Sequence, residues 1–389
     1  MSRFISAFMI LRLTLFAFAD QPVVCVLDGP DAQPMKDSLK RIGQPFAAME
    51  KPDAAALGGH RVLIVCGTKP PVDEGGKQIV ENFLKNGGNV LAVGGGATCM
   101  MQHKLFDAEG YYFTGTTIHM TVFHGYHRLT FGYPGAKPFD GWKEGVPNLL
   151  RATEGPLMVL GPKATSILGY DGGGLYSAAA FQRVGKGILL LIGPDPQGGN
   201  AYYELEKPKL EPGDKLGTEP MLANAIAFLL DPHCNLIPNA GFEENSDLED
   251  SQSNWHWQIT LKNGAAKEWG REGAPEGKTF LKLVCSQDKG WPAVQPHRPI
   301  VVERGRSYEF GCAYRATAAW KLGFVLLKGK LPSLKSETMP PLSIEPSPEW
   351  RRYATRVSIP DDASYLRPTA TLAGKGELCL DDVTLRLGQ

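Results

Sequence analysis

The last third of the sequence closes on the stretch Glu377-Leu378-Cys379-Leu380-Asp381-Asp382-Val383-Thr384-Leu385. Its apolar residues largely alternate with polar ones, which is the pattern of a strand that buries one face. Shorter segments of the same kind precede it at residues 279–284, 307–310, 320–327 and 353–359. Turn clusters rich in Pro, Gly and Asp separate these segments, as in β-sandwich proteins. The sequence therefore predicts an all-β sandwich over residues 234–389.

The segment that opens this region carries adjacent acidic residues, as the closing stretch does. It reads Asn235-Leu236-Ile237-Pro238-Asn239-Ala240-Gly241-Phe242-Glu243-Glu244, and a third segment, Trp350-Arg351-Arg352-Tyr353, begins a late strand. In this order and spacing, the three segments resemble the jelly-roll carbohydrate-binding modules that are joined to many bacterial cellulases and xylanases. The resemblance covers nearly all of residues 235–389. It implies a polysaccharide or other glycan as the partner.

The acidic residues at the two ends of this region are candidate metal ligands. The first and last strands of a sandwich can lie together, which would bring Glu243 or Glu244 near Asp381 or Asp382. Clustered carboxylates repel unless a hard cation collects them, and Ca²⁺ takes about six to eight oxygen ligands, backbone carbonyls included. The resemblance implies a structural calcium ion here, with Glu243, Asp381 and Asp382 as ligands. The alternative is that these acids cap a turn and face water.

Several aromatic residues are candidates for stacking against sugar rings. A sugar presents an apolar face to an aromatic side chain while polar groups bind its hydroxyls. The candidates are Trp255, Trp257, Trp291 and Trp320, with Tyr314 as an addition. Trp255 and Trp257 are two residues apart, so on one strand they share a face. The alternative for each tryptophan is a place in the core of the sandwich.

Residues 20–233 follow a different pattern, in which apolar runs alternate with segments of helical spacing. Strands are expected at residues 23–27, 61–66, 89–93 and 187–193, and helices around residues 35–42, 79–84 and 219–230. This alternation predicts a doubly wound α/β sheet of the flavodoxin-like kind. Residues 111–135, rich in Tyr, Phe, Thr and His, are typical of an antiparallel insertion. The pattern changes abruptly at residues 231–233, so the two domains are expected to touch.

The third expected strand runs into Gly94-Gly95-Gly96-Ala97-Thr98-Cys99. This resembles the nucleophile turn of class I glutamine amidotransferase-like domains, and the resemblance implies that Cys99 is the catalytic nucleophile. Two departures argue against activity: Met100-Met101 follow Cys99 where the family has a second glycine, and the strand at residues 188–192 leads to Gly193-Pro194-Asp195-Pro196 without a histidine. The sequence favours a non-catalytic version of the domain.

Charge excludes one class of function. The 41 basic and 41 acidic residues cancel, so a nucleic-acid partner is not expected.

Residues 1–19 have the features of a secretory signal, with Arg3, an apolar stretch and the cleavage pattern Ala17-Phe18-Ala19. No later segment is apolar enough to predict a membrane span. Seven cysteines at scattered spacing form no disulfide framework, and we expect a secreted, periplasmic or cell-surface protein.

Three hypotheses follow from these patterns. The first is an exported carbohydrate-binding protein with a non-catalytic α/β domain. The second is a cysteine-dependent amide or ester hydrolase that its β-sandwich targets to polysaccharide. The third is a surface protein whose sandwich mediates structural or protein contacts.

Overall fold

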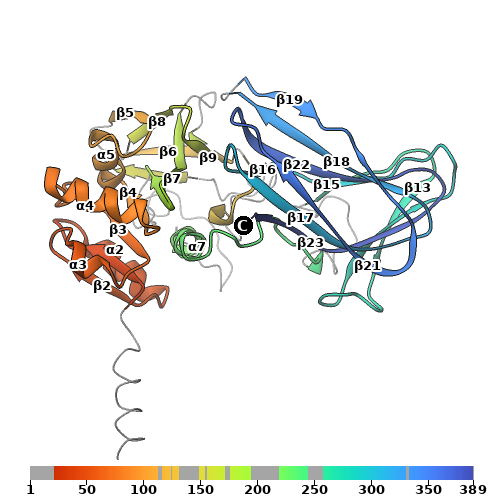
Figure 1. The fold of residues 1–389 in the computed structure, drawn as a ribbon, viewed down its shortest axis with the longest axis horizontal. Helices are drawn as coiled ribbons and strands as arrows, with labels where there is room; N and C mark the ends of the chain where they lie inside the picture. Colours follow the sequence, from red (N-terminus) through yellow and green to blue (C-terminus); the bar gives the residue numbers. More distant parts are fainter. Residues whose placement is uncertain are drawn as a thin grey trace, which may run out of the picture.

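The computed structural model describes residues 22–112, 116–123, 125–130, 149–153, 156–170, 176–193, 219–243, 257–329 and 333–388. The predicted signal at residues 1–19, the alternative acidic residue Glu244, and Trp255 lie outside the described residues. Two parts of the chain, which we call the α/β part (residues 22–230) and the sandwich part (residues 257–388), lie side by side (Figure 1).

The α/β part consists of one mixed sheet and its covering helices. Its strands are β1 (Val24–Leu27), β2 (Phe46–Met49), β3 (Val62–Val65), β4 (Asn89–Val93), β5 (Ala108–Tyr112), β6 (Thr116–Phe123), β7 (Leu149–Thr153), β8 (Pro156–Leu160), β9 (Thr165–Tyr170), β10 (Ser177–Val184) and β11 (Gly187–Ile192). Its helices are α2 (Gln33–Arg41), α3 (Ala54–Leu57), α4 (Glu74–Lys85), α5 (Gly95–Gln102) and α7 (Glu219–Leu230), and a short 3-10 turn η1 covers Arg128–Thr130.

Half of this sheet is parallel and half is antiparallel. The strands β2, β1, β3, β4 and β11 lie next to one another in that order and run parallel. From β11 the sheet continues through β10, β9, β6 and β7 in antiparallel pairs, while β5 pairs with β8. The predicted strand–helix alternation is thus present. It accounts for the parallel half, whereas the antiparallel strands extend well beyond the expected insertion at residues 111–135.

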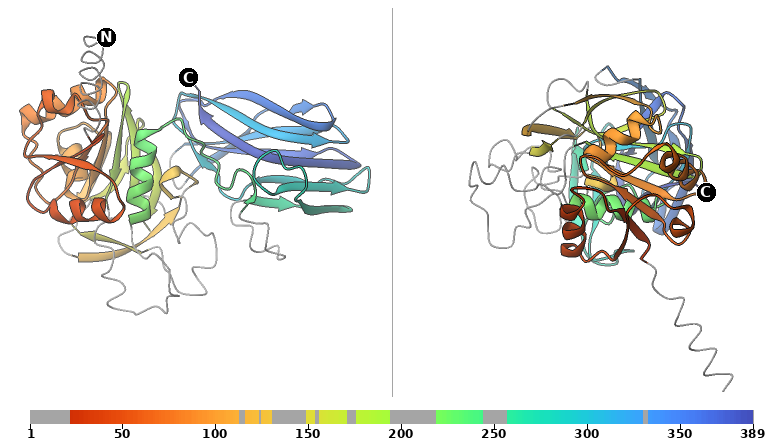
Figure 2. Two further views of the ribbon diagram at one scale, coloured as in Figure 1. Left: turned by 90° about the horizontal axis from the view of Figure 1, so that it is seen from below. Right: turned by 90° about the vertical axis from the view of Figure 1, so that its left-hand side faces the viewer.

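Helices cover both faces of the parallel strands (Figure 2). Side chains on alternate strand positions explain this arrangement, because successive residues point to opposite faces. Val24 and Ile64 belong to the cluster that includes Leu39 of α2 and Ile226 of α7. The intervening positions belong to a second cluster, which includes Leu84 of α4 and residues of α5. The apolar runs in the sequence are therefore buried on both sides, as expected for parallel strands.

Local capping explains where the helices begin and end. The side chain of Asp73 accepts a hydrogen bond of 2.7 Å from the backbone N–H of Gly76, which satisfies a free donor at the start of α4. Asp53 caps α3 in the same way, through Ala56. Helix α4 ends just before Gly87, whose φ of 103° favours glycine.

The sandwich part contains two antiparallel sheets. Its strands are β12 (Trp257–Thr260), β13 (Ala265–Gly270), β14 (Phe280–Cys285), β15 (Ala293–Pro296), β16 (Ile300–Val301), β17 (Ser307–Ala316), β18 (Trp320–Lys328), β19 (Lys335–Thr338), β20 (Leu342–Ile344), β21 (Ser347–Ser358), β22 (Ala363–Leu372) and β23 (Gly376–Leu387). Within the described residues, one sheet has seven strands, in the order β12-β15-β22-β18-β19 with β16 on β22 and β20 on β18. The other has five, in the order β13-β14-β23-β17-β21.

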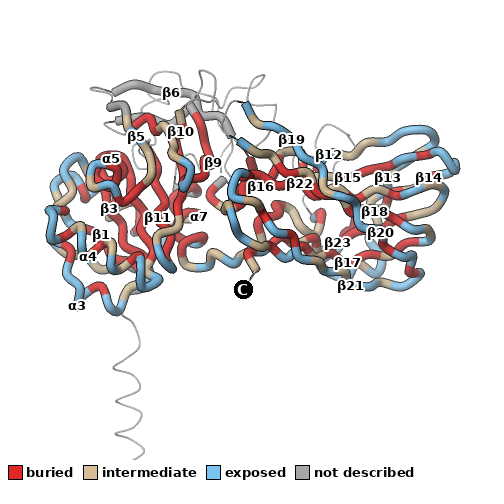
Figure 3. Tube along the Cα trace, turned by 45° about the horizontal axis from the view of Figure 1, so that its top comes forward, coloured by how far each residue is buried: buried red, intermediate tan, exposed pale blue. Residues whose placement is uncertain are grey.

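The apolar residues of the sandwich part meet between its two sheets. Leu322 and Leu366 from the seven-stranded sheet pack in one cluster with Phe310 and Leu380 from the five-stranded sheet. Buried segments accordingly run through the centre of both parts, and exposed segments gather at the loops (Figure 3). The prediction of an all-β sandwich is confirmed.

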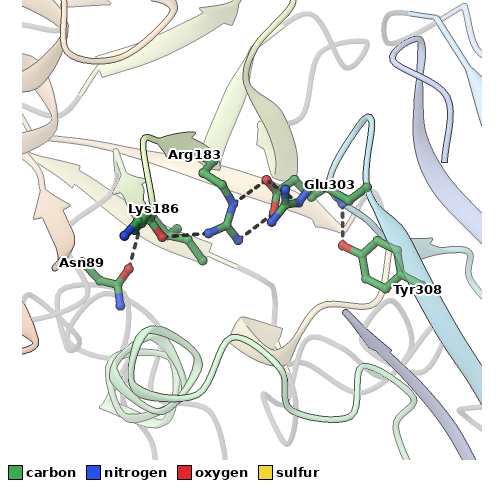
Figure 4. Close-up of polar contacts among 7 residues, drawn as sticks. Asn89, Arg183, Lys186, Glu303 and Tyr308 are labelled. Carbon is green, nitrogen blue, oxygen red and sulfur yellow. Dashed lines mark hydrogen bonds and ion pairs between the residues drawn. The ribbon is translucent and has the colours of Figure 1, made fainter. Parts of the chain in front are cut away.

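The two parts are joined by polar and apolar contacts. Arg183 of β10 donates to Glu303 through Nε–Oε1 (2.6 Å) and Nη2–Oε2 (2.9 Å), and the N–H of Glu303 donates to the hydroxyl of Tyr308 (Figure 4). The hydroxyl of Tyr365 on β22 donates to the carbonyl of Ser166 at 3.2 Å. The two parts touch, as the short boundary in the sequence predicts.

Candidate functional site

The opening segment of the sandwich region lies along its last strand. The side chain of Asn235 accepts a hydrogen bond of 2.9 Å from the N–H of Leu385 and donates to the carbonyl of Val383. The N–H of Val383 in turn donates to the carbonyl of Ala240 at 3.0 Å. The two acidic segments at the ends of the region therefore meet, as the sequence predicts.

This meeting brings Glu243 beside Asp381. Gly241 lies between them, since a Cβ at that position would be 3.6 Å from Asp381 Oδ1 and 3.7 Å from Glu243 Cγ. A single loop donates to both carboxylates: the N–H of Lys278 reaches Glu243 Oε1 at 2.6 Å, and the N–H of Glu276 reaches Asp381 Oδ2 at 3.1 Å. We call this arrangement of Glu243, Asp381 and residues 276–279 the acidic junction.

The acidic junction places the exposed carboxylate of Glu243 next to a buried one. Asp381 is fully buried. Burial raises the pKa of Asp381 to about 6, and the neighbouring charges of Asp382 and Glu243 act in the same direction. For Glu243 burial also acts to raise the pKa, but the N–H groups of Lys278 and Thr279 outweigh it, so the pKa is lowered. A bound cation would offset the repulsion between the carboxylates of Glu243 and Asp381.

Asp382 takes a different position from the one expected of a ligand. Its backbone has a φ of 43°, and its side chain forms an ion pair with Arg352 on β21. In the described ranges, no group of three or more His, Cys, Asp and Glu side chains is arranged to hold a metal ion. The carboxylate of Asp382 thus has Arg352 as a partner, and its role as a calcium ligand stays a prediction. A cation at the acidic junction would depend on Glu243, Asp381 and backbone oxygens.

Three of the predicted sugar platforms, Trp257, Trp320 and Tyr314, belong to the core. Trp257 is 4% exposed, its ring centroid lies 4.9 Å from that of Phe242, and its Nε1 donates to the carbonyl of Asn239. Trp320 is buried against Tyr314, with ring centroids 5.4 Å apart. Both strands turn these positions toward the opposite sheet, so neither ring can meet a sugar. The expectation for Trp257, Trp320 and Tyr314 is wrong.

Trp291 is the predicted platform that the structure leaves accessible. Its side chain is 49% exposed, in the loop that leads into β15. The N–H of Trp291 donates to the carbonyl of Lys262, and the Lys262 ammonium lies 5.2 Å from the ring centroid. Leu261 beside them is 40% exposed. The ring is thus held in place by its own loop while much of it remains open to solvent.

A row of polar side chains, missed by the sequence analysis, crosses the outer face of the seven-stranded sheet. Leu366 and Ala370 of β22 point into the core, so Thr369 between them points outward. The hydroxyl of Thr369 donates to Gln295 Oε1 at 3.2 Å, and Gln295 Nε2 donates to Gln258 Oε1 at 2.8 Å. We call Gln258, Gln295 and Thr369 the polar row. Strand alternation alone marks these positions as outward, but it does not show that they are neighbours.

Cys99 does not occupy a nucleophile turn. The turn itself lies at Gly94 (φ 57°, ψ −119°), and Cys99 follows five residues later inside α5. Cys99 is 7% exposed, and burial raises its pKa to about 11. His103, the next histidine in the chain, directs its ring nitrogens to the carbonyl of Val72 and to Glu74. The expectation that Cys99 is catalytic is corrected, because a buried thiol without a base remains protonated near neutral pH.

Similarity to known proteins is confined to solved structures. The enzymatically active domain of tailspike protein 4 from bacteriophage CBA120 matches at 15% identity with a TM-score of 0.32, over 40% of this chain and 21% of that chain. TmCBM61 in complex with beta-1,4-galactotriose matches at 14% identity with a TM-score of 0.28, over 40% of this chain and 99% of that chain. A family 16 carbohydrate-binding module matches at 18% identity with a TM-score of 0.29, over 39% of this chain and 99% of that chain. No protein-family model and no curated protein matches the sequence.

The longest of the described helices, α4 and α7, contain 12 residues each. In the part of the chain that the structure describes, none is both long and apolar enough to cross a bilayer.

Proposed function

We propose that this protein binds a polysaccharide on the outer face of its seven-stranded sheet. The observation that carries the proposal is the polar row, which places two amides and a hydroxyl side by side on a partly exposed sheet face. Amide side chains both donate and accept hydrogen bonds, as sugar hydroxyls require of a binding site. Trp291 stands at the loop end of the same sheet and supplies an aromatic ring for the apolar face of a sugar.

The spacing of these residues favours an oligosaccharide over a single sugar. Trp291 precedes Gln295 by four positions, and an extended chain advances about 3.3 Å per residue, so the two backbone positions can be up to roughly 13 Å apart. A ligand that contacts both at this separation would be longer than one ring. This favours a polymer chain as the partner.

We also infer that the acidic junction holds a structural calcium ion. The junction fits a hard cation because two acidic side chains lie near one another there and one of them, Asp381, is fully buried. Glu243 and Asp381 would hold the ion together with backbone carbonyl oxygens, which Ca²⁺ accepts. Such an ion would tie the opening segment to β23, and its role would be structural.

For the remainder of the chain we propose a non-catalytic scaffold joined to a jelly-roll module, with the boundary near residue 233. The parallel order β2-β1-β3-β4-β11, with helices on both faces, supports a flavodoxin-like assignment for the α/β part. The burial of Cys99 supports a role without catalysis. The sequence of residues 1–19 supports export, and a secreted or cell-surface protein is the natural setting for binding polysaccharide.

Binding to polysaccharides tests this proposal. The full-length protein is mixed with insoluble xylan, galactan, β-glucan and cellulose, and soluble oligosaccharides of the retained polymer are then titrated calorimetrically. Gln295→Ala should weaken binding about fivefold to tenfold, since it removes the central hydrogen bonds of the polar row. Gln78→Ala, on the exposed surface of α4, is the matched control. Failure of the wild type to bind any polysaccharide, neutral or acidic, or equal binding by Gln295→Ala, would overturn the proposal.

A further inference from the structure

The α/β part closes one end of the outer face of the seven-stranded sheet. Val301 of β16 and Tyr365 of β22 lie on that face and pack into the core of the α/β part. Backbone hydrogen bonds of 2.8 Å join the N–H of Tyr126 to the carbonyl of Pro299 and the N–H of Val301 to the carbonyl of Tyr126. The α/β part therefore covers the outer face of the seven-stranded sheet at its Tyr365 end and forms a wall there. At the other end, Trp291 is exposed.

Basic side chains gather next to this wall. Arg367 follows Tyr365 by two positions on β22, so both side chains point to the same face. His297 and Arg298 lie in the bend between β15 and β16. The backbone N–H of Arg298 donates a hydrogen bond to the hydroxyl of Tyr126. Both guanidinium groups are close enough to His297 and to Tyr126 to act on them electrostatically. We call His297, Arg298 and Arg367 the basic corner.

Arg367 differs from Arg183 and Arg352 because no carboxylate among the described residues pairs with it. Arg183 binds Glu303, and Arg352 binds Asp382. The Nε of Arg367 is buried and has no hydrogen-bond partner among the described residues. Burial lowers the pKa of Arg367, and no carboxylate in the described part of the chain offsets this effect. Removing a guanidinium from water without an anion is unfavourable, so this group is suited to an anion that a ligand brings.

His297 adds a hydrogen-bonding group to this charge. Burial, followed by the charges of Arg298 and Arg367, lowers the pKa of His297. The ring is therefore neutral at pH 7, and it can donate or accept a hydrogen bond without adding to the charge. A sugar ring that carries both an acidic group and hydroxyls matches this combination.

We propose that the basic corner binds the anionic group of an acidic glycan, a uronic acid carboxylate or a sulfate ester, while the rest of the glycan lies over the polar row. The planar guanidinium of Arg367 can bind two oxygens of such a group at once, which makes it selective for carboxylate and sulfate. The inference rests on the proposed function and adds the class of polymer to it. The α/β part helps to define where the anionic group binds. Its residue Tyr126 is held beside Arg298 by backbone hydrogen bonds to Pro299 and Val301.

The test compares three probes of equal length: a galacturonic acid trimer, a sulfated galactose trimer and a neutral galactose trimer. Each is titrated into the full-length protein at about 50 mM salt, where screening of charge is weak. The wild type should bind one of the anionic trimers at least tenfold more tightly than the neutral one. The trimer that binds more tightly distinguishes carboxylate from sulfate. Arg367→Gln should reduce the preference to less than threefold, and Arg367→Lys should retain part of it.

Arg356→Gln, at an exposed position of β21 on the other sheet, is the matched control and should keep the full preference. Equal binding of neutral and anionic trimers by the folded wild type would overturn the basic corner and leave the proposed function standing. A preference that persists in folded Arg367→Gln would also overturn it. If no neutral or anionic glycan binds at all, the proposed function falls and the inference falls with it.

Discussion

Arg183 and Glu303 lie 120 residues apart in the sequence and meet through two N–H···O contacts of 2.6 Å and 2.9 Å. Their side chains are 19% and 13% exposed, so most of the pair is removed from water. One residue belongs to β10 of the α/β part, and the other precedes β17 of the sandwich part. The ion pair therefore couples the stability of the two parts.

Glu303→Gln should weaken this coupling. The substitution leaves Arg183 half-buried with a neutral partner, and we expect the free energy of unfolding to fall by about 2 kcal/mol. Differential scanning calorimetry should show a lower and broader transition as the two parts begin to unfold separately. Glu81→Gln, which removes a surface pair with Lys85, is the control and should change little. Equal melting curves for the two variants would contradict the prediction.

Calcium should stabilise the protein through the acidic junction. We expect the melting temperature to rise by at least about 3 °C when EGTA is replaced by excess Ca²⁺, because an ion that binds only the folded state favours it. Asp381→Asn should abolish the rise, whereas Asp361→Asn at an exposed turn should preserve it. An unchanged melting temperature in wild-type protein would remove the case for a calcium ion.

Cys99 should react slowly with iodoacetamide. With a pKa of about 11, only about one thiol in 10⁴ is ionised at pH 7, and the side chain is buried as well. Peptide mapping should therefore find Cys99 alkylated much more slowly than a free cysteine, and at the ordinary rate once the protein is denatured. Rapid labelling of native Cys99 at neutral pH would restore the hydrolase hypothesis.

His127 should make the protein sensitive to acid. Its ring is buried between Phe181 and Phe228, at centroid distances of 5.5 Å and 4.4 Å, and burial lowers its pKa to about 3. In the unfolded chain the pKa is about 6.5, so between pH 6.5 and 3 the unfolded state binds a proton that the folded state does not. His127 therefore contributes its full stability above pH 6.5, and this contribution is lost as the pH falls.

His127→Phe tests this contribution. The free energy of unfolding, measured by urea titration at several pH values, should fall less steeply between pH 6.5 and 4.5 in the variant than in the wild type. The comparison concerns the slope, so any loss of stability that is common to all pH values does not affect it. Identical slopes would show that His127 is not the titrating group.

Patterns within a strand or helix were sufficient to predict much of the fold. Apolar runs located β1, β3, β4 and β11, and helical spacing located α7. The antiparallel half of the α/β sheet was missed because its strands, such as β10 with Ser177-Ala178-Ala179-Ala180, carry small residues and little periodicity. Their place in the sheet is decided by pairing with distant strands, which no local pattern records.

The same limit applies to the candidate site. The approach of Glu243 to Asp381 could be predicted, because the first and last segments of a sandwich are neighbours. The spacing of Trp255 and Trp257 indicated a shared face but not which face, and Trp257 points into the core. The polar row joins β12, β15 and β22, which come together only when the register of the whole sheet is fixed.

The packing of Val301 and Tyr365 into the α/β part limits how the protein can be divided. Both side chains are 1% exposed in the intact chain. In a fragment that begins near residue 234, Val301 and Tyr365 would be exposed to solvent. Such an exposed apolar surface favours self-association. Light scattering should detect oligomers of such a fragment, whereas charged substitutions at these two positions should keep it monomeric. We therefore expect the sandwich part to depend on the α/β part to remain monomeric.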